Sequence, residues 1–374
     1  MELPVMPPID PMLAKPAGDE VPAPDAVEGG LAYEPKWDGF RALIYRDGDE
    51  VQIWGRGGKD LTYCFPEVVA AALANLPERA VLDGELVVAH DGRLWFEELT
   101  NRIRPRSEAG KWKIAELAEQ SPCAYVAFDA LAVGEQALLA EPYRTRRAAL
   151  ERALAAAQPP FFVTPVTDDQ SLAREWFSHF EGAGLDGLVC KPWQSPYTPG
   201  KRTLLKVKHA RTTDVVVAGW RAHKEPDADG QRVVGSLLLG LYDERGTLHH
   251  VGVASSFSAA RRAALLTELA PYAVGDAGLA GHPWASWAEQ AAHLGSRLPG
   301  GVSRWTGTKD LSWIPLRAEL VAEVAYDHME GDRFRHVAQL VRWRPDRDPQ
   351  SCTYDQLDRP VRFDLGDVLP GVRR

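Results

Sequence analysis

The sequence predicts an α+β chain of two domains, the second of them built mainly of strands. The chain has 374 residues, which is more than one ordinary domain needs, and a hydrophobic content of 45% can supply two cores. Segments with period-two hydrophobicity alternate with helical segments up to about residue 212, and strand-like segments dominate after it. We therefore expect an irregular lead-in over residues 1–30, a first domain over 31–212 and a second domain over 213–374.

The first domain is expected to mix antiparallel strands with helices. Strands are predicted within 31–56, because Arg41, Leu43 and Tyr45 alternate with the residues between them and Asp47-Gly48 is typical of a hairpin turn. The remaining elements are expected in this order: a helix at 66–76 opened by Pro66, strands at 81–88 and 125–131, helices at 145–157 and 172–181, and strands at 185–191 and 204–208.

The second domain is expected to be a small barrel. Strands are predicted at 215–217, 236–242, 249–254, 320–326 and 334–343, with one helix at 258–269. Five or so strands around one helix are typical of a Greek-key barrel such as an OB-fold. Residues 271–312 contain four tryptophans and show no clear period.

Composition excludes several classes of protein. No apolar run approaches the length that crosses a bilayer, and the first residues lack the basic and apolar segments of a secretory signal. Four cysteines are scattered without a Cys-x-x-Cys pair, which argues against a disulfide framework or a zinc site and favours a reducing cytoplasm. No feature indicates oligomerisation, so we expect a monomer.

The charge balance by itself favours an acidic enzyme acting on small molecules. Lys and Arg number 43 and Asp and Glu 52, which gives a net charge of −9, whereas nucleic-acid binders are usually basic. Basic residues nevertheless gather locally: six lie between Lys191 and Arg211 with no acid among them, and five lie between Arg102 and Lys113 with one acid. Local fields decide where a polyanion binds, so these two segments are candidates for phosphate contacts.

Lys36 is the candidate nucleophile. It lies in the run Glu34-Pro35-Lys36-Trp37-Asp38-Gly39-Phe40-Arg41, a tight turn with acids on both sides. An amine must lose its proton to act as a nucleophile, and neighbouring acids favour the ammonium form. The amine therefore needs help from a bound metal and a nucleotide. Taken alone, the same pattern also fits a surface hairpin with a solvated lysine.

Further chemistry-bearing segments follow in chain order. Attack on a nucleotide α-phosphate needs cations for the phosphates, carboxylates for Mg²⁺ and a surface for the base. Arg41 and Arg56 are forked donors suited to phosphate or ribose oxygens, and a strand through Leu82-Asp83-Gly84-Glu85-Leu86 would place both carboxylates on one face.

The later segments supply the base surface and more charges. Phe128-Asp129-Ala130-Leu131 offers an aromatic ring, and Asp186-Gly187-Leu188-Val189-Cys190-Lys191 offers a carboxylate and an amine. In Leu205-Lys206-Val207-Lys208 the two lysines share a strand face and would clamp phosphates, close in sequence to Arg202. A solvated strand edge protected by lysines is the alternative.

Together these segments resemble the motifs of covalent nucleotidyltransferases, the DNA ligases, RNA ligases and mRNA capping enzymes. Motif I corresponds to 36–41, motif III to 82–86, motif IIIa to 128–131, motif IV to 186–191, motif V to 205–208 and motif VI to 342–347. The whole chain, including 8–15 and 323–336, resembles bacterial ATP-dependent DNA ligases of the compact two-domain type. Asp186 replaces the usual glutamate of motif IV, and Arg347 the usual lysine of motif VI.

The resemblance implies a fold and a set of site residues. The fold is a nucleotidyltransferase (adenylation) domain of antiparallel sheets with flanking helices, followed by an OB-fold domain. Lys36 would be the catalytic nucleophile, and Glu85 and Asp186 would bind Mg²⁺ or Mn²⁺. ATP would contact Glu34, Arg41, Arg56, Glu85, Phe128, Lys191, Arg202, Lys206, Lys208, Arg344 and Arg347. With the local charge, the resemblance also predicts DNA contacts by Arg102, Arg104, Arg106, Lys201 and Arg211.

The implied activity is the sealing of nicks or breaks in duplex DNA, in the nucleoid of a bacterial cytoplasm. Lys36 would take AMP from ATP, pass it to a 5′-phosphate, and the 3′-hydroxyl would then displace it. A hinge is expected near 209–213, because motif VI must approach ATP and then withdraw. An RNA ligase or a GTP-using capping enzyme is the nearest alternative. A non-catalytic nick-binding or end-binding module is another, and an unrelated small-molecule enzyme would make six ordered motifs accidental.

Overall fold

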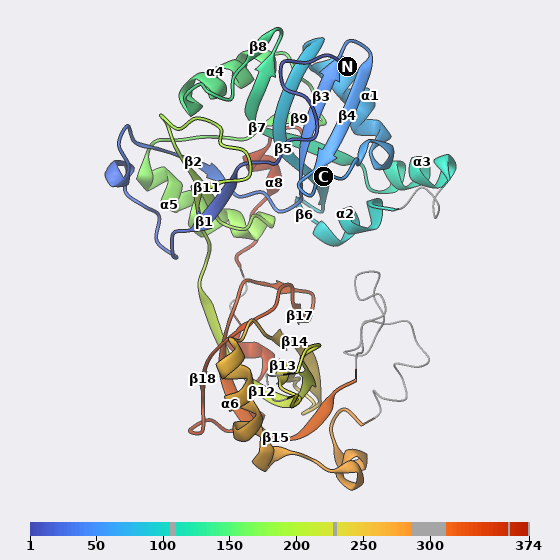
Figure 1. Ribbon diagram of the computed structural model, residues 1–374, viewed down its shortest axis with the longest axis vertical. Helices are drawn as coiled ribbons and strands as arrows, with labels where there is room; N and C mark the ends of the chain where they lie inside the picture. The colour runs from blue at the N-terminus through green and yellow to red at the C-terminus, as the bar shows by residue number, and fades with distance from the viewer. Residues whose placement is uncertain (105–109, 227–229, 286–311, 358–359, 373–374) are drawn as a thin grey trace. The chain divides into compact units, whose positions relative to one another are not determined.

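The computed structural model describes residues 1–104, 110–226, 230–285, 312–357 and 360–372 (Figure 1). The chain divides into two compact units, one formed by Met1–His209 with Pro360–Arg374 and the other by Ala210–Arg359. The division falls close to the expected boundary at 212. The last fifteen or so residues differ from expectation, since they belong to the first unit and not to the second.

The larger sheet of the first unit has the strand order β4-β3-β5-β7-β8, with β6 paired to β5 and β9 paired to β7. Its pairings are antiparallel except for β9, which runs parallel to β7. The predicted strands around 40–55, 81–88 and 125–131 are confirmed. The strands are β3 (Phe40–Asp47), β4 (Glu50–Gly55), β5 (Arg79–His90), β6 (Arg93–Leu94), β7 (Cys123–Val133), β8 (Gln136–Ala137) and β9 (Phe161–Val163).

A second sheet brings together segments that lie far apart in the sequence. Its order is β1-β11-β10-β2, formed by β1 (Leu13–Pro16), β11 (Arg202–Val207), β10 (Leu188–Pro192) and β2 (Leu31–Pro35). An irregular lead-in was expected over residues 1–30, but it contains strand β1, which runs parallel to β11. Motif I follows β2, motif IV leads into β10 and motif V ends β11, so this sheet places three of the motifs side by side.

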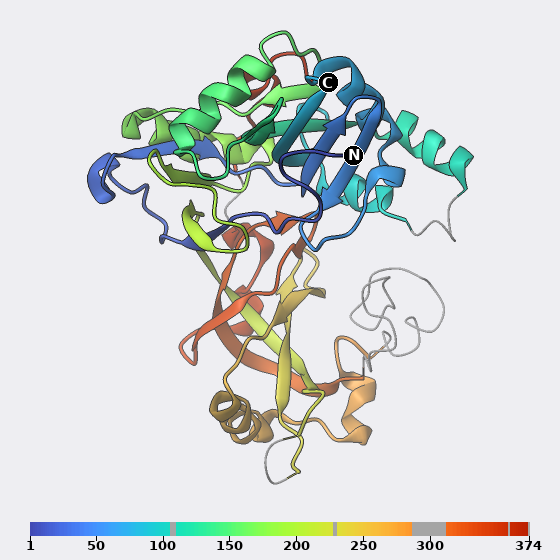
Figure 2. The same ribbon diagram turned by 45° about the horizontal axis from the view of Figure 1, so that its top comes forward.

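Helices and the lead-in cover opposite faces of the larger sheet (Figure 2). Successive side chains of β3 point to opposite faces of the sheet. Ile44 is buried among residues of the helices at 66–75 and 143–153, and Leu43 is buried among residues of the lead-in on the other face. The helices of this unit are α1 (Pro66–Asn75), α2 (Phe96–Arg102), α3 (Lys111–Gln120), α4 (Tyr143–Ala153), α5 (Gln170–His179) and α8 (Leu365–Val368). Helices α2 and α3 were not predicted, because α2 is short and four of the ten residues of α3 are charged.

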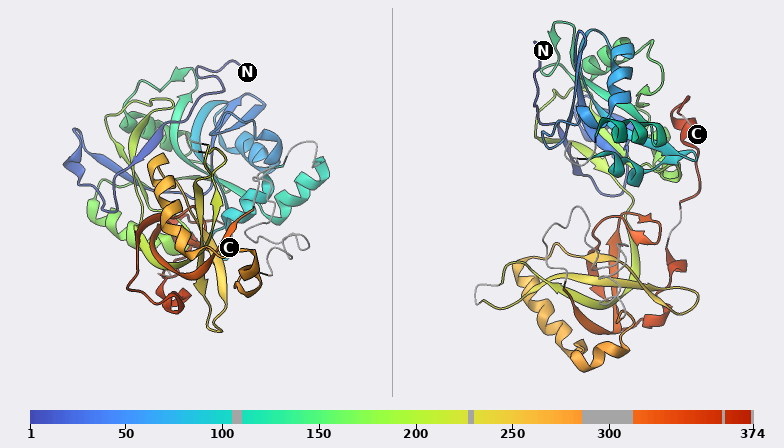
Figure 3. Two further views of the ribbon diagram at one scale, coloured as in Figure 1. Left: turned by 60° about the horizontal axis from the view of Figure 1, so that its bottom comes forward. Right: turned by 90° about the vertical axis from the view of Figure 1, so that its right-hand side faces the viewer.

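The C-terminal segment is built into the first unit (Figure 3). Leu365 is fully buried in a cluster that also contains Trp37, the residue after the candidate nucleophile. The Leu365 amide donates to the Gly92 carbonyl at 2.7 Å. At Gly182 an added Cβ would lie 1.9 Å from the Val361 carbonyl oxygen, so the backbone of this segment approaches where only glycine leaves room.

The second unit contains a five-stranded antiparallel sheet of order β14-β13-β12-β15-β18. Its elements are β12 (Arg211–Ala222), β13 (Val234–Tyr242), β14 (Leu248–Ala254), α6 (Ala259–Leu269), β15 (Ile314–Tyr326), the hairpin β16 (Met329–Glu330) and β17 (Arg333–Phe334), and β18 (Gln339–Trp343). The predicted helix and strands are confirmed, except that 334–343 is interrupted: Phe334 ends β17, and β18 begins at Gln339. Leu238, Val251, Leu265 and Trp284 share one buried core.

Most of the segment 271–312, with Trp287 and Trp305, lies outside the described ranges. In the part of the chain that is described, every helix is too short or too polar to cross a bilayer.

Candidate active site

Lys36 is held in a fixed turn beside the motif IV segment. Its amide donates to the Gly187 carbonyl at 2.8 Å, and the Asp186 amide donates to the Lys36 carbonyl at 2.9 Å. Gly187 has φ +106°, and a Cβ there would lie 2.1 Å from the Val207 carbonyl oxygen, so glycine is required. The Lys36 Nζ lies 2.6 Å from Asp186 Oδ2 with 23% of its side chain exposed, which keeps the amine anchored and reachable.

The Asp186 carboxylate holds two ammonium groups. Lys208 Nζ lies 2.9 Å from the same oxygen that binds Lys36. Burial acts to raise the pKa of Asp186, but the charges of Lys36 and Lys208 outweigh burial and hold that pKa below its ordinary value. Asp186 is therefore ionised at neutral pH, and the shorter side chain still reaches both lysines. Lys206 lies half-buried on β11, opposite Val189 of β10.

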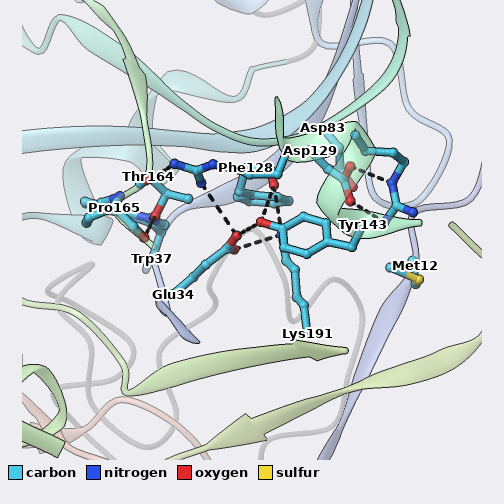
Figure 4. Close-up of polar contacts among 12 residues, drawn as sticks. Met12, Glu34, Trp37, Asp83, Phe128, Asp129, Tyr143, Thr164, Pro165 and Lys191 are labelled. Atoms are coloured by element: carbon cyan, nitrogen blue, oxygen red, sulfur yellow. Dashed lines mark hydrogen bonds and ion pairs between the residues drawn. The ribbon is translucent and has the colours of Figure 1, made fainter. Parts of the chain in front are cut away.

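Glu34 is the centre of a buried network on the other side of the same turn (Figure 4). Its Oε2 lies 2.8 Å from Lys191 Nζ, the Tyr143 hydroxyl donates to its Oε1, and Arg147 Nη1 lies 3.8 Å from that oxygen. Lys191 also donates to the Phe128 carbonyl at 2.9 Å and lies 4.7 Å from the centroid of the Phe128 ring. This network brings together Glu34, Lys191 and Phe128, three of the residues expected to contact ATP.

Three residues of this region escaped the sequence analysis. Tyr143 and Arg147 come from α4, and Thr164 follows β9. The Trp37 indole donates to Thr164 Oγ1 at 2.8 Å, and Arg147 Nη2 donates to the Thr164 carbonyl at 2.8 Å. These bonds fix the residue next to Lys36, and no local sequence signal pairs a helix arginine with a distant loop threonine.

Arg41 is engaged inside the protein. Its Nε and Nη2 donate to the two oxygens of Asp83 at 2.9 and 2.6 Å, and its Nη1 donates to the Met12 carbonyl. The Tyr197 hydroxyl donates to the same carboxylate at 2.6 Å. Asp83 is fully buried, so this bidentate pair fixes the lead-in to the sheet. The guanidinium also lies 5.2 Å from the Phe128 ring centroid, which keeps Arg41 at the edge of the site.

Glu85 is a carboxylate without a dominant cation partner. Burial, opposed by the charges of Lys36 and Arg41, raises the pKa of Glu85 from 4.5 to about 7. Gly39 makes the approach of the turn feasible, because a Cβ there would lie 2.1 Å from the Leu86 carbonyl oxygen and 3.0 Å from Glu85 Cγ. At such a pKa the Glu85 carboxyl is partly protonated at neutral pH, and a cation bound beside it would stabilise its ionised form.

The carboxylates fit a magnesium ion that arrives with its substrate. Among the described residues no group of three or more His, Cys, Asp or Glu is arranged to hold a metal. Mg²⁺ is commonly bound through one or two carboxylates together with substrate phosphates and waters. Glu85 and Asp186 are two carboxylates that both interact with Lys36, Glu85 through the charge of the amine and Asp186 by direct contact.

The motif VI arginines, Arg344 and Arg347, lie in the second unit, where both pair with the Asp214 carboxylate. Arg344 Nη1 lies 3.1 Å from both oxygens of Asp214, and its Nε and Nη2 bind Asp346 at 2.9 Å. Arg347 Nε lies 3.4 Å from Asp214 Oδ2. Asp214 was not singled out from the sequence. In the first unit, Arg56 is exposed in the turn after β4, and Arg202 is exposed on β11.

Among the predicted DNA contacts, the prediction for Arg102 is wrong. It is fully buried on α2, where its guanidinium binds Glu67 at 2.7 Å and donates to the Ser121 and Cys64 carbonyls at 2.6 and 3.0 Å. A basic run cannot show which of its members faces inward. Lys201 is exposed, Arg104 and Arg211 are half-buried, and Arg106 lies outside the described residues.

Comparisons with known proteins agree with this geometry. The model of the ATP dependent DNA ligase domain matches residues 11–208, and that of the ATP dependent DNA ligase C terminal region matches 230–347. DNA ligase C2 of Mycolicibacterium smegmatis is 52% identical over 96% of this chain and 97% of its own. DNA ligase C of Mycobacterium tuberculosis is 49% identical over 100% of both chains.

A solved structure supports the fold. A Lig E DNA ligase has a TM-score of 0.52 at 17% identity, covering 89% of this chain and 99% of its own. The family models and the full-length relatives together show that this chain belongs to the family of ATP-dependent DNA ligases.

Proposed function

We propose that this ATP-dependent DNA ligase seals nicks or breaks in duplex DNA through an adenylate carried on Lys36. The observation that carries the proposal is the Lys36 amine, 2.6 Å from Asp186 with Lys208 on the same oxygen. The shared carboxylate holds the nucleophile beside a second ammonium group, so a phosphate that binds there would meet both the attacking amine and a neutralising cation.

The first step forms a nitrogen–phosphorus bond. The Lys36 nitrogen, after losing its extra proton, attacks the α-phosphorus of ATP, and the bond between that phosphorus and the bridging oxygen to the β-phosphate breaks. Pyrophosphate leaves with the bonding pair. In the second step an oxygen of the DNA 5′-phosphate displaces the lysine nitrogen, and in the third the 3′-hydroxyl attacks that phosphate and AMP leaves.

The other site residues receive roles from their surroundings. Lys206, Lys208 and Arg202 lie on or just after β11 and would hold phosphate oxygens. Phe128 would stack on adenine, and the pair of Glu34 and Lys191 beside it would orient the nucleoside. Arg41 is held by Asp83 and Arg56 is exposed, so Arg56 is the better placed of the two for a phosphate or ribose contact.

Glu85 and Asp186 would hold Mg²⁺ or Mn²⁺. When bound, the metal neutralises charge that develops on the α-phosphate and on the leaving pyrophosphate. Asp186 contributes an ionised carboxylate, and Glu85 releases its proton when a cation approaches.

The second unit is proposed to be an OB-fold. Support comes from its strand order, from α6 lying between its third and fourth long strands, and from an isolated parallel bridge between Ala254 at the end of β14 and Ala338 just before β18. Such a bridge joins the two edge strands, as barrel closure requires. The boundary between the units at His209 and Ala210 supports the proposed hinge near 209–213.

The DNA contacts are proposed to come from exposed cations. Lys201 and Arg202 are exposed at the start of β11, whereas Arg104 and Arg211 are half-buried and each donates to a backbone carbonyl. Phosphate contacts by such residues position DNA without reading its sequence. The protein is further proposed to act as a monomer in the cytoplasm, in association with the nucleoid; its four free cysteines fit a reducing compartment.

The test is a choice of nucleotide and of polymer. The protein is incubated with labelled ATP or GTP and then with singly nicked DNA or RNA duplexes at several salt concentrations. We expect label transfer from ATP and sealing of nicked DNA, with affinity that falls steeply as salt rises. Transfer from GTP, or sealing of RNA in preference to DNA, would assign the chain to the capping or RNA-joining alternative. Nick binding without any label transfer would make it a binding module.

A further inference from the structure

Asp214 is placed where it can control both motif VI arginines. It lies on β12, shortly after the boundary between the units at His209 and Ala210. Pairing of β12 with β13 begins at Val216, so on that edge of Asp214 the Gln356 side chain takes the place of β13. On the other edge, Glu323 of β15 lies opposite Asp214. The Gln356 amide donates to the Asp214 carbonyl at 2.9 Å and accepts from the Asp214 amide at 3.3 Å. The backbone of Asp214 is thereby held in place, with 11% of its side chain exposed.

The two arginines use the carboxylate differently. Each guanidinium nitrogen of Arg344 binds a carboxylate, with Nη1 on Asp214 and the other two on Asp346. Among the described residues Arg347 forms one ion pair, from Nε to Asp214 Oδ2 at 3.4 Å, and that nitrogen makes no hydrogen bond to any of them. Arg344 is 19% exposed and Arg347 is 38% exposed. Arg344 is therefore a strut, and Arg347 is the arginine able to exchange its partner for a phosphate.

The backbone of this turn is held by β15, because the Arg344 amide donates to the Val321 carbonyl at 2.9 Å. Asp214 acts on the side chains, because its carboxylate reaches both guanidinium groups from β12. Without that carboxylate the backbone of the turn keeps its place, but the Arg347 guanidinium loses its partner and the Arg344 guanidinium loses one of its two. A displacement of about 1 Å in a group that contacts the reacting atoms can cost roughly a hundredfold in rate.

We propose that Asp214 is a positioning residue that presents Arg347, through the Arg344 strut, to the pyrophosphate leaving group of the first step. The inference rests on the proposed function, because it concerns the attack of Lys36 on ATP. It adds a residue outside the nucleotidyltransferase motifs, and it assigns different roles to the two arginines of motif VI.

The experiment separates the first step from the last. Formation of the lysyl adenylate from ATP is timed for the full-length protein, and sealing of a nick that already carries AMP on its 5′-phosphate is timed in parallel. For Asp214→Asn we expect adenylate formation to slow by about tenfold to a hundredfold. Sealing of the adenylated nick should stay within about twofold, because no pyrophosphate leaves in that step. Asp214→Glu, which keeps the charge, should recover part of the rate.

Two further variants make the result specific. Arg344→Lys keeps the charge but removes the fork between two carboxylates, so the same step-specific loss is expected. On an Arg347→Ala background, Asp214→Asn should add little. Glu319→Gln is the matched control, because Glu319 forms an exposed ion pair with Arg317 on β15 and should change neither step.

Several outcomes would overturn the inference. One is adenylate formation at the wild-type rate in both Asp214→Asn and Arg344→Lys. Another is an equal loss in both steps from variants whose unfolding midpoints match the wild type, which would make Asp214 a general structural residue. If the wild-type protein itself forms no adenylate from ATP, the proposed function fails, and this inference fails with it.

Discussion

Glu85→Gln is expected to stabilise the ligand-free protein by about 2 kcal/mol at pH 8 and to reduce nick sealing by roughly a hundredfold or more. Burial raises the pKa of Glu85 from 4.5 to about 7, against the charges of Lys36 and Arg41. Ionising the group in the folded state therefore costs about 3 kcal/mol, and the glutamine amide avoids most of that cost. Activity falls because the substituted side chain cannot bind a metal as a carboxylate does.

The pH dependence of this gain follows from the sign of the shift. The folded pKa lies above the unfolded one, so folding binds a proton between pH 4.5 and 7 and the cost of Glu85 grows across that range. The stabilisation by Glu85→Gln should be absent near pH 4.5 and complete above pH 7. Urea unfolding at pH 5 and pH 8 measures it. A gain in unfolding free energy of the same size at both pH values, or a loss at pH 8, would show that burial does not make the ionised Glu85 carboxylate unfavourable.

Asp83→Asn is expected to lower the free energy of unfolding by about 3–5 kcal/mol. Asp83 is fully buried and accepts two hydrogen bonds from Arg41 and one from Tyr197. An amide cannot accept all three, so the substitution leaves the Arg41 charge inside the protein without a counter-ion. Removing one partner of a buried pair costs far more than the pair contributed when intact. Denaturant unfolding at pH 7 is the measurement.

A matched substitution separates burial from charge. Glu135→Gln removes the same carboxylate chemistry from an ion pair with Arg79, but 79% of the Glu135 side chain is exposed. Its expected cost is below about 1 kcal/mol, because solvent screens such pairs. Similar costs for the two variants would mean that the Arg41 pair is no more important than a surface contact.

Most of the elements are readable from the sequence because they rest on local patterns, and the candidate site residues come from motifs that resemble those of known nucleotidyltransferases. Alternation along 40–47 gives the strand and its two buried faces, and Gly39 and Gly187 stand where a Cβ would collide with a neighbouring carbonyl. The motif order then predicts that Lys36, Asp186 and Lys208 lie together. In the structure the two lysine amines contact the same oxygen of the Asp186 carboxylate.

The remaining features depend on long-range pairings that local patterns do not encode. Nothing near Asp214 in the sequence indicates that it binds two arginines more than a hundred residues away. Arg102 belongs to a basic run, yet Glu67 draws it into the core. The C-terminal segment did carry a signal: apolar Leu365, Val368, Leu369 and Val372 have the spacing of one helix face, and such a face must be buried against something.

The Lys36 amine of this ligase is proposed to carry AMP. The intact mass of the purified protein before and after incubation with ATP and Mg²⁺ tests this proposal. We expect the wild type, and a control with the exposed Lys224 changed to alanine, to gain the mass of one adenylyl group. Lys36→Ala should gain nothing. An adenylyl gain that persists in Lys36→Ala, or a wild type that never gains it, would show that Lys36 is not the residue that carries AMP.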